Sequence, residues 1–195
     1  MDYFELFGLP RRLAVDSAAL QQRFYELARR YHPDFHQCGT PTEREAAERE
    51  SARVNAAYRS LRDPIGRVEY LVRLEEGRES KEASASKPAT PPALLAEMFE
   101  LQEAVAEAKG TALDDTTRAE LARRRDALKA RQAAEEAAIG GSLSQAWDRA
   151  SDADRPTALA ALKMALATRA YLRTVIADLD ETLGEQPGDV AHHRY

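Results

Sequence analysis

The sequence has little cysteine, glycine or proline, and it has no long apolar run. Its single cysteine, Cys38, excludes an internal disulfide and is typical of a reducing compartment. No stretch has the length of apolar residues that a membrane span needs. The first residues, Met-Asp-Tyr-Phe-Glu, lack the basic and apolar regions of a signal peptide. We therefore predict a cytoplasmic protein that has no membrane partner.

The composition indicates a helical protein. Only 9 glycines and 9 prolines occur in 195 residues, whereas Ala, Leu, Glu and Arg are abundant, which favours an all-α fold with sharp breaks. The mild net charge of −5 argues against a general nucleic-acid binder. The first 75 residues carry 12 arginines against 12 acidic residues and no lysine, so the acidic excess lies in the rest of the chain.

The N-terminal part predicts a helical hairpin. A short helix capped by Asp2 extends to Leu9, and a second helix, capped by Asp16, extends to Tyr31. The second helix has one apolar face, whose residues recur at helical spacing: Leu20, Phe24, Leu27 and Tyr31. The outer surface of this helix is basic and carries Arg23, Arg29 and Arg30.

A sharp turn follows this helix. Pro33 prevents the helix from continuing and biases the residue before it toward extended angles, so the stretch Tyr31-His32-Pro33-Asp34 places an imidazole and a carboxylate in a loop. Thr40-Pro41-Thr42-Glu43 is a capping box with proline at the first helical position, and it predicts a third helix to about Arg62. Residues 65–74 predict one more short helix. A basic helix face is often simply solvated, but its position beside this loop favours a docking surface.

The C-terminal part predicts an antiparallel three-helix bundle. Residues 1–75 form the first domain, and residues 76–92, which lack periodic apolar positions, form a linker. The bundle occupies residues 93–184, with helices over 93–110, from Asp114 or Asp115 to 139, and over 155–183. We expect Gly140-Gly141 to break the middle helix and Ser142–Ala150 to be helical, with Trp147 packed inward. The tail, residues 185–195, is expected to fray.

The N-terminal arrangement resembles the J-domain, which is a helical hairpin with a His-Pro-Asp loop. The resemblance rests on the amphipathic basic helix, on His32-Pro33-Asp34 with a tyrosine directly before it, and on the capped helix after the loop. It implies a co-chaperone that binds a DnaK-class chaperone and stimulates its ATP hydrolysis, so the chain itself is not an enzyme. The residues that this resemblance places in the chaperone-binding site are Arg23, Arg29, Arg30, Tyr31, His32, Pro33 and Asp34.

The chain is also similar to the HscB family of iron–sulfur co-chaperones. The similarity lies in Asp2-Tyr3-Phe4-Glu5-Leu6-Phe7-Gly8-Leu9-Pro10, in Val54-Asn55-Ala56-Ala57-Tyr58-Arg59-Ser60-Leu61-Arg62-Asp63-Pro64, and in Arg67 with Glu69-Tyr70-Leu71. This resemblance implies two partners, the chaperone HscA and the iron–sulfur scaffold IscU, and no cofactor of its own. The bundle would deliver IscU to HscA and so promote cluster transfer to acceptor proteins.

The same resemblance places a scaffold-binding site on the bundle. Its residues are Leu95, Ala96, Phe99, Glu100 and Glu103 on the first bundle helix, with Tyr171 on the last. The spacing of Leu95, Phe99 and Glu103 puts them on one helix face, outside the inward stripe of Met98, Leu101 and Val105. An exposed Phe99 beside glutamates is suited to a partner surface. The alternative is that Phe99 lies at the edge of the bundle core.

Two other functions remain open at this point. The first is a J-domain co-chaperone of a general DnaK that serves a different client. The second is a metal-binding protein that uses His32, His36 and Cys38, although the chain has no Cys-x-x-Cys pair to support a metal site. No Walker sequence and no Gly-x-Gly-x-x-Gly sequence is present, so nucleotide chemistry has no support.

Overall fold

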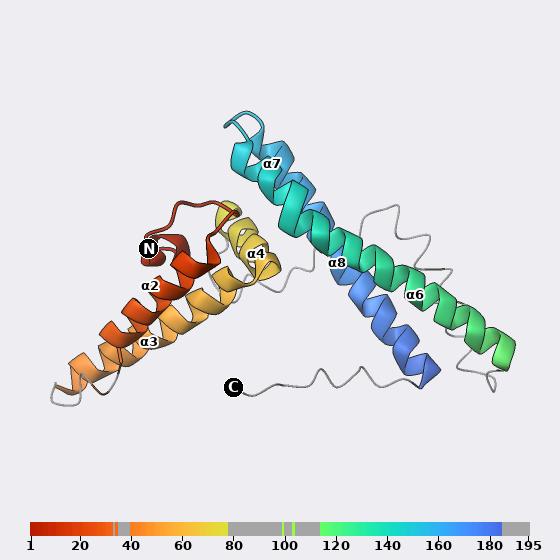
Figure 1. The fold of residues 1–195 in the computed structure, drawn as a ribbon, viewed down its shortest axis with the longest axis horizontal. Coiled ribbons are helices and arrows are strands. Elements are labelled where there is room, and N and C mark those ends of the chain that lie inside the picture. The colour runs from red at the N-terminus through yellow and green to blue at the C-terminus, as the bar shows by residue number, and fades with distance from the viewer. Residues whose placement is uncertain (33, 35–39, 78–98, 100–102, 104–113, 185–195) are drawn as a thin grey trace. The chain divides into compact units, whose positions relative to one another are not determined.

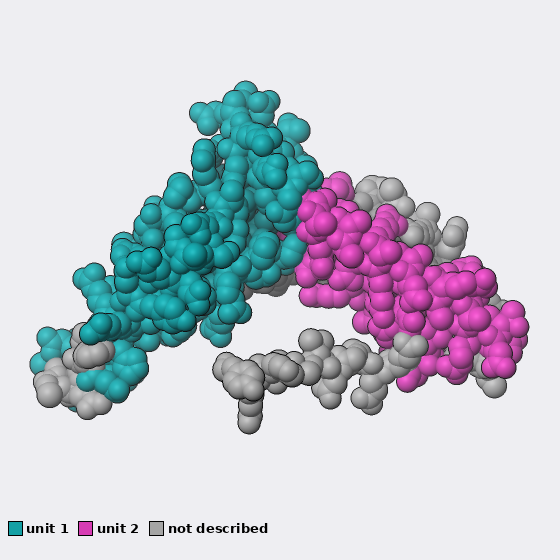
Figure 2. All heavy atoms as spheres, in the orientation of Figure 1, with its two compact units in different colours: residues 1–85, 139–162 teal, residues 86–138, 163–195 magenta. Residues whose placement is uncertain are grey.

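The computed structural model describes residues 1–32, 34, 40–77, 99, 103 and 114–184. Within these ranges the regular elements are all helices, which confirms the all-α class. The chain divides into two compact units (Figure 2). The first contains residues 1–85 and 139–162, and the second contains residues 86–138 and 163–195. Residues 139–162, which we expected in the bundle, thus pack with the N-terminal part.

Helix α1 (Tyr3–Phe7) begins at a complete capping box. The Glu5 backbone N–H donates to Asp2 Oδ1 at 2.9 Å, and the Asp2 N–H donates to Glu5 Oε2 at 3.0 Å. The helix ends two residues before the predicted Leu9, because Gly8 adopts the left-handed conformation with φ 66°. Phe4 is fully buried and anchors this short helix in the core of the first unit.

Helices α2 (Ser17–Arg30) and α3 (Pro41–Arg62) run side by side as the predicted hairpin (Figure 1). Asp16 caps α2, and the predicted capping box of Thr40 and Glu43 begins α3. The α2 stripe faces α3, since Leu20 and Leu27 are buried and the Phe24 ring stacks on Tyr58 with centroids 4.1 Å apart. His32 therefore lies at the end of the hairpin where α2 ends and α3 begins.

Helix α4 (Pro64–Glu75) follows α3 after one residue. Asp63 caps it by accepting the Gly66 N–H at 2.7 Å, and Val68 and Leu71 are buried. Arg67 is also buried, with only 7% of its surface exposed. A buried guanidinium in the middle of this helix was not predicted, and its hydrogen bonds are described below.

The predicted break at Gly140-Gly141 is wrong. Residues Ile139–Leu143 form a π-helical turn, and α7 (Ser144–Arg149) follows it directly. Neither glycine has the left-handed φ that ends α1 at Gly8, so their flexibility does not break the helix here. Burial of Ile139 and Trp147 outweighs the low helix propensity of glycine, which costs about 1 kcal/mol per residue relative to alanine. The predicted inward position of Trp147 is confirmed.

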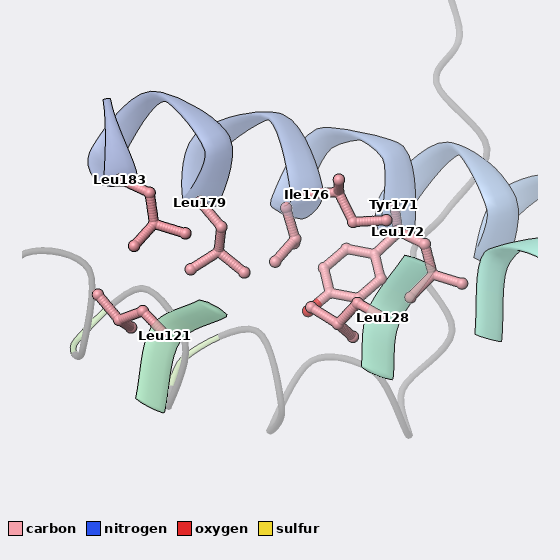
Figure 3. Packing of buried hydrophobic residues seen from close by; sticks show 8 residues of the cluster. Leu121, Leu128, Tyr171, Leu172, Ile176, Leu179 and Leu183 are labelled. Atoms are coloured by element: carbon pink, nitrogen blue, oxygen red, sulfur yellow. The ribbon is translucent and has the colours of Figure 1, made fainter. Parts of the chain in front are cut away.

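In the second unit, α6 (Asp115–Ala138) packs antiparallel to the part of α8 (Arg155–Leu183) that begins at residue 163. Figure 3 shows α8 side chains directed toward Leu121 and Leu128 of α6. Polar pairs flank this core: Asp180 lies 3.1 Å from Lys129 Nζ and 3.5 Å from Arg125 Nη1. The pKa of Glu136 is lowered by two hydrogen bonds, of which the one from Gln132 has the larger effect and the one from Arg169 the smaller.

The core between α6 and α8 gives a direct test of stability. Leu179 is completely buried, so Leu179→Ala is expected to lower the free energy of unfolding by about 2–5 kcal/mol through lost contacts and a cavity. Chemical denaturation measures this change. Met164→Ala is the matched control on the same helix, because Met164 is 52% exposed and its truncation is expected to change stability little. Equal losses in both variants would contradict the assigned core.

Several predicted segments lie outside the described residues. They are the linker beyond residue 77, the first bundle helix at 93–110 apart from residues 99 and 103, and the tail 185–195. That a first bundle helix over 93–110 packs with α6 and α8 as the third helix of the bundle therefore stays a prediction.

Candidate functional site

The loop after α2 places the predicted imidazole and carboxylate next to each other. The Asp34 backbone N–H donates to His32 Nδ1 at 3.2 Å, and the Asp34 Oδ2 atom lies 3.5 Å from the same nitrogen. Both side chains are exposed, so the loop offers polar groups to a partner. Pro33 lies outside the described residues.

The last turn of α2 is basic. Arg29 and Arg30 are both exposed, and the Arg30 guanidinium lies 5.6 Å from the centre of the Tyr31 ring. Arg23, one of the predicted contacts, forms an ion pair with Glu26 at 2.8 Å. Its charge is therefore partly balanced within the helix. Arg29 and Arg30 place two further cationic side chains at the end of α2, beside His32.

Tyr25 is an exposed aromatic residue that the sequence analysis did not select. It is 61% exposed, and its hydroxyl accepts a hydrogen bond from Gln21 Nε2 at 3.2 Å. Tyr25 stands four residues before Arg29, so the two lie on the same face of α2. Helical spacing already places Tyr25 outside the stripe of Leu20 and Leu27, and that signal identifies it as a surface aromatic.

The described residues at the end of α2 and in the following loop, from Arg29 to Asp34, offer polar and charged groups for binding. Among the described ranges, no group of three or more His, Cys, Asp or Glu side chains is arranged to hold a metal ion. His36 and Cys38, which the alternative metal site requires, lie outside those ranges. The described groups suit complementary contacts with an acidic surface, which mainly set orientation and association rate.

The predicted scaffold-binding residues are only partly described. Phe99 and Glu103 are both helical and exposed, Phe99 to 65%. Leu95, Ala96 and Glu100 lie outside the described residues. Tyr171 is only 8% exposed, and its ring lies beside Leu128 in the core (Figure 3). Tyr171 therefore presents little surface to a partner, and its contact with a scaffold stays a prediction.

Two family profiles match different parts of the chain. The profile described as "DnaJ domain" matches residues 2–70, and the profile described as "HSCB C-terminal oligomerisation domain" matches residues 90–157. The hairpin, the His32–Asp34 loop and the first of these matches define a J-domain protein. Proteins of this class stimulate the ATPase of an Hsp70-class chaperone and are not themselves enzymes.

Solved structures match nearly the whole chain. The chaperone HscB from Vibrio cholerae is 29% identical, with 92% of this chain and 99% of that chain covered and a TM-score of 0.53. The human co-chaperone protein HscB is 27% identical, with 93% of this chain and 81% of that chain covered and a TM-score of 0.60. The chain belongs to the HscB family of J-domain co-chaperones of iron–sulfur cluster assembly. None of the described helices is long and apolar enough to cross a membrane.

Proposed function

We propose that this co-chaperone delivers an IscU-type iron–sulfur scaffold to an HscA-type chaperone and thereby promotes transfer of the cluster to acceptor proteins. The observation that carries the proposal is Phe99, a large apolar side chain that is 65% exposed within the range matched by the HscB C-terminal profile. A phenylalanine with this exposure is a favourable anchor for a protein partner. Glu103, one turn later, adds negative charge to the same face.

The proposed chaperone contact uses the end of α2 and the following loop. Arg29 and Arg30 approach an acidic surface of the HscA-type partner, while His32 and Asp34 form hydrogen bonds at its edge. These contacts stabilise the hydrolysis-competent state of the chaperone, so stimulation is a shift in its population of states. In this mechanism the co-chaperone takes no chemical part in ATP hydrolysis, which the chaperone carries out.

The test is the steady-state ATPase rate of an HscA-type chaperone with this protein alone and with IscU added. We expect stimulation by the co-chaperone alone and a larger, more than additive rate when both are present. Additive rates would retain the J-domain activity but assign the C-terminal part to another client, which is the function of a general DnaK co-chaperone. The control for nonspecific client effects is a protein unrelated to iron–sulfur assembly, added in place of IscU.

Tyr25 supplies a further prediction about the chaperone contact. Tyr25→Ala is expected to raise the co-chaperone concentration for half-maximal stimulation roughly 5- to 30-fold, the loss typical of an exposed aromatic that becomes buried in an interface. Titration of the ATPase rate measures this concentration. Tyr25→Phe is the matched control and is expected to keep most of the affinity, because it removes only the hydroxyl. Unchanged titration of Tyr25→Ala would remove this residue from the proposed surface.

A further inference from the structure

Asp148 in α7 binds the loop that leads into α2. Its Oδ1 atom accepts the Leu13 N–H and its Oδ2 atom accepts the Ala14 N–H, each at 2.8 Å. Leu13 and Ala14 belong to the connection between α1 and α2, about 135 residues earlier in the chain. Both oxygens of one carboxylate are therefore directed at consecutive backbone amides within the first unit.

Arg67 holds the other side of the same peptide segment. Its Nη1 donates to the Leu13 carbonyl, and its Nε donates at 2.8 Å to the carbonyl of Leu61 in the last turn of α3. Carbonyls in a last helical turn have no partner within the helix, so Arg67 also caps α3. Burial is the main effect on Arg67 and lowers its pKa, while the charges of Asp63 and Asp148 oppose that shift.

The support behind Asp148 is itself well packed. Its neighbour Trp147 is buried, with the Arg155 guanidinium 5.3 Å from the centre of its ring. The buried Ser144 hydroxyl donates to the Ile139 carbonyl at 2.5 Å and ties α7 to the π-helical turn. A Cβ added at Gly140 of that turn would lie 3.7 Å from Pro64 Cβ, so the turn lies directly against the start of α4. Asp148 thus projects from a fixed position.

We propose that Asp148, with Arg67, is a positioning residue for the J-domain: it fixes Leu13 and Ala14 and so sets where α2 begins against α3. We call Leu13, Ala14, Arg67 and Asp148 the Asp148 cluster. Asp148 lies beyond the DnaJ domain match at residues 2–70, so chaperone stimulation depends on a side chain that the J-domain does not contain. Helix α2 begins three residues after Ala14 and ends two residues before His32. The cluster therefore acts at one end of the helix and the chaperone contact lies at the other.

The expected consequence is a loss of affinity rather than of maximal rate. Without the Asp148 cluster, α2 remains packed on α3 through Leu20 and Leu27. However, α2 then occupies its binding-competent position against α3 in a smaller fraction of the molecules than in the wild type. A protein whose competent state is only partly populated binds more weakly by that fraction. Coupling of this kind predicts a concentration for half-maximal stimulation that is roughly 2- to 30-fold higher, with the rate at saturation retained.

The test compares Asp148→Asn with Asp152→Asn in the full chain. Both changes remove one negative charge, but the Asp152 side chain is fully exposed and contacts neither Leu13 nor Ala14. In Asp148→Asn the amide NH₂ faces one of the two N–H donors, so Leu13 and Ala14 are expected to lose protection from hydrogen exchange at least tenfold. The same variant is expected to need more protein for half-maximal ATPase stimulation, and Asp152→Asn is expected to match the wild type in both measurements.

Four outcomes measured on folded protein would overturn the proposal. They are free-peptide exchange rates for Leu13 and Ala14 in the wild type, lost protection in Asp148→Asn with an unchanged titration, a lower saturating rate with unchanged affinity, and equal effects in Asp152→Asn. Asp148→Glu keeps the charge and is expected to recover part of the affinity. If Asp148→Asn and Asp148→Glu both fail to fold, the residue serves folding and not positioning. The assay requires only an Hsp70-class ATPase, so its result is independent of the proposed scaffold delivery.

Discussion

Replacing His32 with glutamine is expected to abolish stimulation of the chaperone ATPase while the fold stays intact. His32 lies in an exposed loop after α2, where it accepts the Asp34 N–H but contributes nothing to a buried core. Glutamine is polar and of similar reach, yet its side-chain amide does not reproduce the two nitrogens of the imidazole ring. The steady-state ATPase rate measures the loss, and thermal unfolding monitors the fold.

Two comparisons make this result specific. Binding of the scaffold to His32→Gln is expected to equal that of the wild type, because the proposed scaffold residues lie in the C-terminal part. Asp178→Asn, at an exposed position of α8, is the control for an unrelated polar change and is expected to stimulate normally. Full stimulation by His32→Gln would show that the loop is not the chaperone contact.

Replacing Phe99 with alanine is expected to weaken scaffold binding by about 1–3 kcal/mol, or roughly 5- to 150-fold in the dissociation constant. The reason is the loss of a large apolar side chain that is 65% exposed in the free protein and becomes buried against the partner. Isothermal titration calorimetry with an IscU-type scaffold measures the change. Chaperone stimulation by the variant in the absence of scaffold is expected to be unchanged.

The matched control for this prediction is Met164→Ala. Met164 is another large apolar side chain with more than half of its surface exposed, and it lies outside the proposed site. If affinity falls equally in both variants, exposed apolar area in general explains the effect, and if a folded Phe99→Ala binds unchanged, Phe99 is not part of the contact. Glu103→Gln extends the test, since loss of a peripheral charge is expected to change the salt dependence of binding more than the affinity itself.

The local elements of this fold were predictable from the sequence because their causes are local. Asp2 with Glu5 and Thr40 with Glu43 stand three residues apart, and each pair forms the capping box that its spacing predicts. The stripe of Leu20 and Leu27 packs inward because helical spacing alone puts them on one face. The position of His32 in a loop follows from Pro33 in the same way.

The glycine pair shows that tertiary packing can override local helix propensity. Gly140 and Gly141 have low helix propensity, and the sequence therefore predicted a break. The chain instead forms a π-helical turn in which Ile139 is buried, and Trp147 in the following helix α7 is buried as well. A propensity difference of about 1 kcal/mol per glycine is smaller than the gain of roughly 1.5–3 kcal/mol from burying one large apolar side chain. Tertiary packing decided this element.

The candidate sites show the same difference between features set by local sequence and features set by tertiary packing. The sequence by itself determined the helical hairpin, its basic α2 face and the His32–Asp34 loop, since each depends on spacing within one helix or turn. For Phe99 it left two positions open, a surface position and the edge of the core, and the structure shows a side chain that is 65% exposed. Only the tertiary structure revealed that Tyr171 is buried and that Arg67 and Asp148 meet at Leu13. Those contacts join residues 54 and 135 positions apart in the chain, and no periodicity within a segment specifies a partner at such a distance. The folded state favours these contacts because a buried guanidinium or a backbone amide that lacks a hydrogen bond costs free energy, and here residues distant in sequence provide the bonds.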